Sequence, residues 1–162
     1  MPRLILPTVA LALILAAPSG AAEKVTDSDR FKLWDGCRPM HLVVENLPKD
    51  ATEIGLTKKA ITVMARSRLR AARLYSSAPV TPFLFISVTV VGAAFSVLVT
   101  YDKWMTDRAS GVSRGVSAWM TGSTGTHGGG NAPYILSSVS QQVDKFIDEY
   151  LRVNESACRK SN

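Results

Sequence analysis

The sequence contains few of the residues from which metal sites and catalytic centres are commonly built. Its 162 residues include two cysteines, Cys37 and Cys158, and two histidines, His41 and His127. These four side chains match no zinc-ligand spacing, so we expect no metal site. The chain also lacks a Walker loop and a dinucleotide-binding fingerprint, and we expect no cofactor.

Acidic residues are missing from one segment of the chain. Residues 58–73 contain six lysines and arginines and no aspartate or glutamate. The net charge of the whole chain is +6, but outside this segment and residues 1–22 there are 12 basic and 13 acidic residues. The positive charge is therefore concentrated in one element, which indicates a localised basic surface.

Only two apolar stretches are long enough to suggest a membrane span or an export signal. The first, residues 4–17, follows Arg3 and precedes the small residues 18–22. A positive charge, an apolar run and small residues, in this order, are typical of a cleavable secretory signal peptide. Pro7 interrupts the run, which is shorter than the roughly 20 residues that a membrane span prefers. We therefore predict cleavage near Ala22 and a periplasmic or secreted mature protein, with an uncleaved N-terminal anchor as the alternative.

Export determines how the two cysteines are interpreted. An oxidising compartment favours disulfide formation, and two cysteines allow one internal pairing, between Cys37 and Cys158. Free thiols or an intermolecular bridge are the alternatives. The internal bridge would join the two ends of the mature chain and stabilise it by roughly 4–5 kcal/mol in the chain-entropy account.

The second apolar stretch, residues 83–101, contains no charged residue. Its length would permit a membrane span, but its Val, Thr and Phe content and the interruption at Gly92 favour β-structure. Apolar residues alternate in both halves, so we predict two strands that turn near Gly92. Residues 116–121 are expected to add a further strand after a loop around Ser110 and Gly111.

One more strand and two helices complete the expected elements. Residues 40–45 indicate a first strand, and Thr57 can cap a helix that runs to about Tyr75. Asn131 opens a final helix that ends near Cys158, in which apolar residues recur every three or four positions. These apolar residues are Leu136, Val139, Val143, Phe146, Tyr150 and Val153.

The predicted order of elements is β-α-β-β-β-α. A parallel crossover followed by an antiparallel meander places both helices on one face of a mostly antiparallel sheet. We therefore predict an α+β fold, a two-layer sandwich, formed by a single domain over residues 37–158. It would follow the signal peptide, residues 1–22, and a polar N-terminal segment, residues 23–36, and precede a C-terminal tail, residues 159–162.

One candidate site is the glycine-rich segment before the final helix. We expect a flexible loop whose N–H groups could cradle an anion at the helix N-terminus, with His127 as a weak candidate for a general base. A mobile connection with a solvent-exposed histidine is the alternative. The segment consists of Gly122, Ser123, Thr124, Gly125, Thr126, His127 and Gly128.

The other candidate site is the basic face of the helix that begins at Thr57. Lys59, Arg66, Arg70 and Arg73 are separated by seven, four and three positions, which places them on one helical face. This face could bind an acidic envelope protein, an anionic polysaccharide or lipid head groups, or it could simply be solvated. Nucleic acid is not expected as a partner of an exported protein.

The three tryptophans, Trp34, Trp104 and Trp119, are expected mainly to pack at the edges of the core, although they could form a binding surface.

Several segments resemble a family of small exported bacterial proteins. They are Gly-Ser-Thr-Gly-Thr-His-Gly-Gly, residues 122–129, and Glu-Tyr-Leu-Arg-Val-Asn-Glu, residues 149–155, followed by Cys158. Residues 68–75 belong to the same resemblance, which spans most of the mature chain. The family is uncharacterised, so the resemblance implies a periplasmic bacterial protein but no activity and no catalytic residue.

Taken together, these patterns favour a non-enzymatic periplasmic binding or envelope-assembly module that uses the basic helix face. One alternative is a small hydrolase or anionic-ligand-binding protein that uses the glycine-rich segment and His127. Another is a homodimeric structural subunit, because the strand expected in residues 83–91 is apolar on both sides although helices would cover only one face of the sheet.

Overall fold

The computed structural model describes residues 24–79, 81–128 and 131–160. The predicted signal peptide, residues 1–22, and the last two residues of the predicted tail lie outside these ranges. The described residues form four helices and four strands. In chain order these are α1 (Asp27–Leu33), β1 (His41–Val44), α2 (Lys49–Glu53), α3 (Lys58–Ala71), β2 (Phe83–Val91), β3 (Ala94–Thr106), β4 (Ser113–Thr126) and α4 (Ala132–Cys158).

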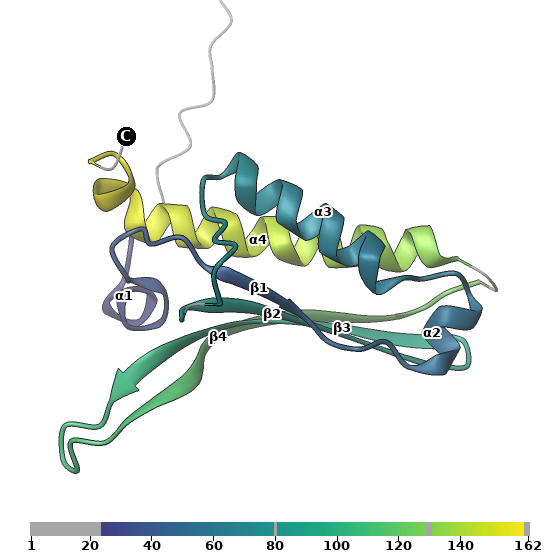
Figure 1. Ribbon diagram of the computed structural model, residues 1–162, viewed down its shortest axis with the longest axis horizontal. Coiled ribbons are helices and arrows are strands. Elements are labelled where there is room, and N and C mark those ends of the chain that lie inside the picture. Colours follow the sequence, from purple (N-terminus) through teal and green to yellow (C-terminus); the bar gives the residue numbers. More distant parts are fainter. Residues whose placement is uncertain (1–23, 80, 129–130, 161–162) are drawn as a thin grey trace, which may run out of the picture.

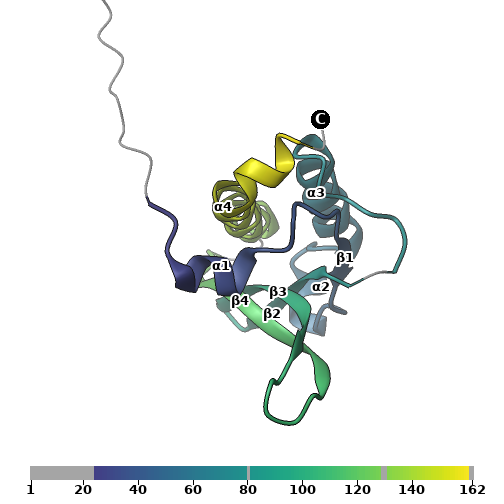
Figure 2. The ribbon, with the colours of Figure 1, turned by 90° about the vertical axis from the view of Figure 1, so that its left-hand side faces the viewer.

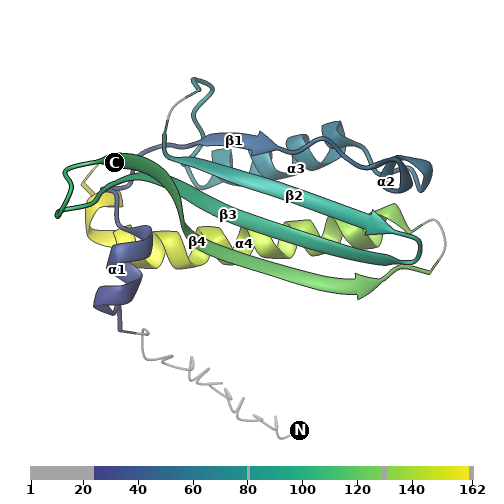
Figure 3. The same cartoon turned by 90° about the horizontal axis from the view of Figure 1, so that it is seen from below.

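The strands form one sheet in the order β1-β2-β3-β4. β1 pairs with β2 in parallel, and the β2–β3 and β3–β4 pairs are antiparallel. Helices α3 and α4 lie side by side on one face of this sheet, and no described helix of comparable length lies on the opposite face (Figures 1, 2 and 3). The predicted α+β fold, a two-layer sandwich with a mostly antiparallel sheet, is confirmed.

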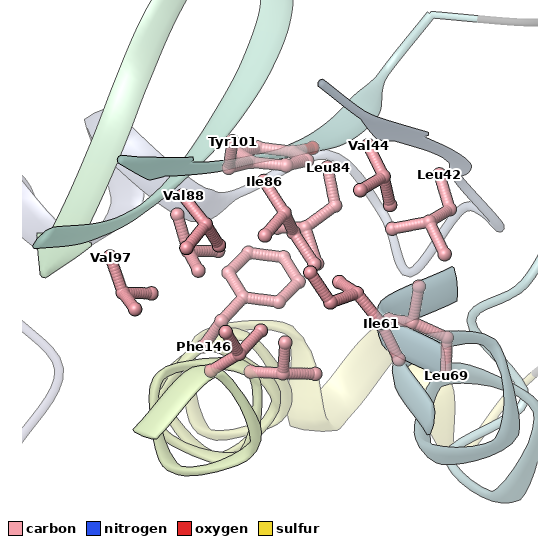
Figure 4. Close-up of a cluster of buried hydrophobic side chains, with 14 of the residues drawn as sticks. Leu42, Val44, Ile61, Leu69, Leu84, Ile86, Val88, Val97, Tyr101 and Phe146 are labelled. Carbon is pink, nitrogen blue, oxygen red and sulfur yellow. The ribbon is translucent and has the colours of Figure 1, made fainter. Parts of the chain in front are cut away.

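The core lies between the sheet and the two long helices (Figure 4). Alternate residues of the strands, such as Leu84 and Ile86, point into it and are fully buried. Phe146 of α4 sits at its centre, with its ring 5.4 Å from that of Tyr101 and 5.2 Å from that of Trp119. Burying one such aromatic side chain contributes about 1.5–3 kcal/mol, so the apolar stripe of α4 fixes that helix on the sheet.

The end of α4 is linked to the chain just before β1. Cys37 and Cys158 form a disulfide across 121 positions of sequence, with their Cα atoms 5.2 Å apart. The predicted internal pairing is thus confirmed. It joins the C-terminal end of α4 to the segment between α1 and β1.

Residues 83–101 form β-structure, as their alternating pattern predicts. Gly92, with φ 55°, supplies the turn between β2 and β3. Among the described residues, no helix has the length and the apolar character needed to cross a membrane. β3 and β4 both extend well beyond the predicted strands, and their outer ends form a hairpin that projects past the start of β2 (Figures 1 and 3).

The polar N-terminal segment, predicted as residues 23–36, is not a mere extension of the domain. It contains α1, whose capping box joins Thr26 and Asp29 by two reciprocal hydrogen bonds of 3.0 and 3.1 Å. Leu33 of α1 is 1% exposed and belongs to the core. Sequence reasoning missed this helix because a helix of two turns with one buried residue leaves no recognisable apolar period.

Candidate functional site

The C-terminal end of α3 differs from its predicted position. The helix begins after Thr57, whose hydroxyl accepts a hydrogen bond from the Ala60 N–H, but its last helical residue is Ala71 rather than one near Tyr75. Arg73 has φ 59°, the left-handed conformation that usually requires glycine. This residue reverses the chain, and no glycine marks the reversal in the sequence.

Main-chain hydrogen bonds fix the reversal. The N–H of Leu74 donates to the carbonyl of Leu69 at 2.8 Å, and that of Arg73 donates to the carbonyl of Arg70 at 2.9 Å, which is a Schellman motif. Leu69 and Leu74 are both fully buried, as the hydrophobic contact of this motif requires. The residue that follows, Tyr75, is consequently held in a defined position.

Tyr75 lies at the edge of the sheet. It forms an isolated parallel bridge with Met40, in which the Met40 N–H donates to the Leu74 carbonyl at 2.7 Å and the Ser76 N–H donates to the Met40 carbonyl at 2.8 Å. The half-buried ring therefore stands on a fixed main chain beside the last turns of α3.

Two arginines of α3 contact this ring. The guanidinium carbon of Arg66 lies 5.5 Å from the centre of the Tyr75 ring, and that of Arg70 lies 5.0 Å from it. Both distances are within the range of cation–π attraction. Arg66 and Arg70 are one helical turn apart, so one aromatic ring orders two neighbouring positive charges.

The remaining bases of the segment have other surroundings. Arg68 forms an ion pair of 2.7 Å with Asp144 of α4, and the Lys58 ammonium donates to the Asn46 side chain at 2.9 Å. Lys59 is exposed in the first turn of α3, whereas Arg73 lies beyond the end of the helix. Of the four predicted site residues, the structure therefore brings Arg66 and Arg70 together. Within the described ranges, no carboxylate lies within ion-pair distance of either.

The glycine-rich segment is not the loop that the sequence predicts, because Gly122, Ser123, Thr124, Gly125 and Thr126 belong to β4. Residues on the inner side of this strand bond to α4. Ser123 bonds to Ser138 at 2.7 Å, and Thr121 donates to Gln142 at 2.8 Å. Gly128 lies outside the strand, and Gly129 and Gly130 lie outside the described residues.

Gly125 has a steric role in this strand. It pairs with Phe95 of β3, and a Cβ atom on Gly125 would approach the Phe95 ring to 2.9 Å. The ring in turn packs edge-on against Tyr134 of α4. A glycine inside a strand commonly marks such a close approach, and this one allows an aromatic side chain to cover the strand.

His127 is 5% exposed and not the solvent-exposed side chain that the loop interpretation expects. Its Nε2 lies 3.0 Å from the carbonyl of Gly92, and its main-chain N–H donates to Ala93 at 2.8 Å. A cavity near the end of β4 is lined by Phe95, Gly125 and neighbouring residues, but His127 is not one of its lining residues. His127 thus connects the end of β4 to the β2–β3 turn.

A polar cluster that sequence reasoning missed lies near the disulfide. The carboxylate of Asp35 accepts a hydrogen bond from the Tyr101 hydroxyl at 2.6 Å and a second one from the Tyr150 hydroxyl. Burial, followed by the charge of Asp35, raises the pKa of both phenols. Both tyrosines therefore remain protonated donors at neutral pH, and both oxygens of the Asp35 carboxylate are occupied.

Two of the three tryptophans are not packed as predicted. Trp119 is 7% exposed, and its indole N–H donates to Glu149 at 2.7 Å. Trp34 and Trp104, however, are 42% and 62% exposed. The prediction of core-edge packing is thus confirmed for Trp119 alone.

Comparison with known proteins does not identify the chain. No protein-family model matches it, and no curated protein matches it either. Within the described ranges, no group of three or more His, Cys, Asp or Glu side chains could hold a metal ion.

Proposed function

We propose that the protein is a non-enzymatic binding or assembly module of the bacterial envelope, and that Arg66 and Arg70 bind an anionic group of its partner. The observation that carries this proposal is the shared contact of both guanidinium groups with the Tyr75 ring. Like charges repel, so two ordered arginines without a nearby carboxylate favour an anion between or beside them.

The geometry lowers the cost of binding. An arginine side chain has about 2 kcal/mol of rotamer entropy to lose, and its contact with Tyr75 restricts the guanidinium before the partner arrives. The planar donor pattern of arginine suits carboxylate, phosphate and sulfate groups. These groups occur on acidic envelope proteins, lipid head groups and anionic polysaccharides, whereas nucleic acid is not expected in this compartment.

The disulfide supports the cellular location in this proposal. A bridge between Cys37 and Cys158 fits an extracellular or periplasmic protein. We infer that the signal peptide, residues 1–22, directs export and is removed near Ala22.

The proposal is tested with the mature protein and three probes: poly-glutamate, phosphatidylglycerol vesicles and heparin. The variant Arg66→Glu/Arg70→Glu should bind the preferred probe at least ten-fold more weakly than the wild type. The control Lys49→Glu/Lys160→Glu makes the same charge change at exposed positions outside α3 and should stay within about two-fold of the wild type. Equal affinity of the two variants would refute the proposed site.

A homodimeric subunit is a second candidate, favoured by the uncovered face of the sheet. On this face Val91, Leu98 and Met120 are 68%, 40% and 63% exposed, and the face is open to solvent across β2, β3 and β4 (Figure 3). Sedimentation should then show a dimer that Leu98→Lys dissociates. A monomer at all concentrations up to the millimolar range would exclude it. The geometry of His127 gives no comparable support to the hydrolase alternative.

A further inference from the structure

The β3–β4 hairpin projects past β2 (Figure 1). Residues of β3 in this projection line a cavity of about 320 Å³. It is lined by Lys103, Trp104, Met105 and Thr106, which are four consecutive residues of β3. Consecutive residues of a strand point to opposite faces of the sheet. A cavity that touches all four must therefore be centred on the edge of the strand and not on either face.

This edge of β3 is unpaired. The β2–β3 ladder ends at the pair Phe83 and Asp102, while β3 continues beside β4 to the pair Thr106 and Ser113. Pro82, which also lines the cavity, precedes β2 and has no N–H with which to extend the ladder. Beyond Asp102, no described strand pairs with the side of β3 that faces β2.

The direction of the main-chain groups follows from the alternation of antiparallel pairing. The main-chain groups of odd-numbered residues in β3 point toward β4. The two residues that flank the strand show this direction, because the Ala93 carbonyl accepts from the His127 N–H and the Asp107 N–H donates to the Val112 carbonyl. The bulge near Tyr101 places its extra residue in β4, so the alternation along β3 is unbroken. The N–H and C=O groups of Trp104 and Thr106 therefore point to the open side. In the described part of the chain, no main-chain group pairs with them there.

The walls of the cavity include aromatic rings, one available cation and Asp35, whose two carboxylate oxygens already accept hydrogen bonds from Tyr101 and Tyr150. Trp34 and Trp104 contribute partly exposed rings. The Lys103 ammonium is engaged, because it donates to the carbonyls of Phe31 at 2.7 Å and Trp34 at 3.2 Å. Arg38 donates through Nε to the Asp35 carbonyl at 3.1 Å, and its terminal amino groups bond to no other described residue. Arg38 therefore presents a positive charge beside the unpaired edge.

We propose that this edge binds a short, extended, acidic peptide segment of a partner protein. The segment adds as a strand beside residues 103–106, and its main chain bonds to Trp104 and Thr106. Its carboxylate binds the terminal amino groups of Arg38, and its apolar side chains contact Trp34 and Trp104. Strand addition of this kind obtains affinity from main-chain hydrogen bonds and specificity from the flanking side chains. The site is separate from the arginine pair on α3 and does not depend on it.

The surroundings of the cavity favour a protein partner. In the described ranges, ten large apolar side chains are exposed. Five of them lie on the projecting hairpin, on α1 or directly after α1. They are Phe31, Trp34, Trp104, Val112 and Val116. Clustered exposed apolar groups with a polar rim are typical of interaction surfaces.

The experiment uses isotope-labelled mature protein and N-acetylated pentapeptides that alternate Thr with Val, Leu, Phe or Trp and end in Glu. We expect at least one peptide to bind, with downfield shifts and slowed hydrogen exchange at the amides of Trp104 and Thr106. Main-chain N-methylation of that peptide should abolish binding, and replacing its Glu by Gln should weaken binding at least five-fold. Arg38→Gln should remove the preference for Glu.

Two results would overturn the proposal: no peptide binds at millimolar concentration, or the N-methylated peptide binds as well as its parent. Arg70→Glu serves as the control that separates the two proposed sites. It should leave peptide binding unchanged, and a loss of binding in this variant would place the peptide on α3 and contradict strand addition at β3.

Discussion

The side-chain oxygen of Asn154 accepts a hydrogen bond of 3.3 Å from the main-chain N–H of Cys37. Asn154 lies four positions before Cys158, the disulfide partner of Cys37. The same oxygen accepts from the N–H groups of Asp35 and Gly36, each at 3.2 Å. Gly36 and Cys37 both have positive φ, so a single carboxamide stabilises an uncommon backbone conformation. The side chain is fully buried, which excludes glycosylation of its Asn-Glu-Ser sequence in the folded protein.

Asn154→Ala should destabilise the protein by about 2–4 kcal/mol, since it leaves three partly buried N–H groups without their acceptor. Asn131→Ala is the matched control, because Asn131 caps α4 at an exposed position and its loss should cost about 1 kcal/mol. Urea denaturation measures both. Equal costs for the two variants would show that the hydrogen bonds of Asn154 contribute little.

Alkaline pH should destabilise the fold through Tyr101 and Tyr150. Their pKa values are raised in the folded protein by burial and by Asp35, whereas in the unfolded chain they ionise near pH 10. Their contribution to stability is therefore complete below pH 10 and declines above it, by up to roughly 1.4 kcal/mol per pH unit for each tyrosine.

The dependence is measured by denaturation between pH 8 and about pH 11. The variant Tyr101→Phe/Tyr150→Phe is expected to be less stable at neutral pH and to lose less stability as the pH rises. If the stability of the variant declines above pH 10 as steeply as that of the wild type, other groups cause the decline.

Gly125→Ala should cost about 1–3 kcal/mol, since the new Cβ would meet the Phe95 ring. Gly128→Ala is the natural comparison, because a Cβ at Gly128 has no neighbour within 4 Å. The second change should be close to neutral in thermal denaturation. Similar, small effects at both positions would instead favour the flexible loop that the sequence predicts.

The elements with a strong apolar period could be predicted from the sequence. The stripe from Val139 to Val153 defines α4, and the alternation on both sides of Gly92 defines β2 and β3. Both patterns follow directly from burial on one side of an element. The Cys37–Cys158 bridge could be predicted because export leaves these two cysteines a single internal pairing.

Features that depend on distant contacts could not be predicted. Residues 122–126 have the composition of a loop, but contacts with Phe95 and α4 make them a strand. The carboxylate of Asp35 meets a tyrosine 66 positions away and another 115 positions away, a pairing that no local pattern reveals.

The arginine pair was accessible to sequence reasoning only in part. The spacing of Arg66 and Arg70 places them on one helical face, and the structure brings them together. Their aromatic partner was missed because α3 was expected to continue to about Tyr75, and Arg73 occupies the left-handed position where glycine would have marked the end of the helix.

The central claim is that the Tyr75 ring orders Arg66 and Arg70 for an anionic partner. It is tested most directly by the affinities of Tyr75→Phe and Tyr75→Leu for the preferred anionic probe, with all charges retained and folding verified by thermal denaturation. Two cation–π contacts near the surface amount to about 1–2 kcal/mol, so Tyr75→Leu should bind about 5- to 30-fold more weakly, and Tyr75→Phe should match the wild type. Wild-type affinity in Tyr75→Leu would contradict the account.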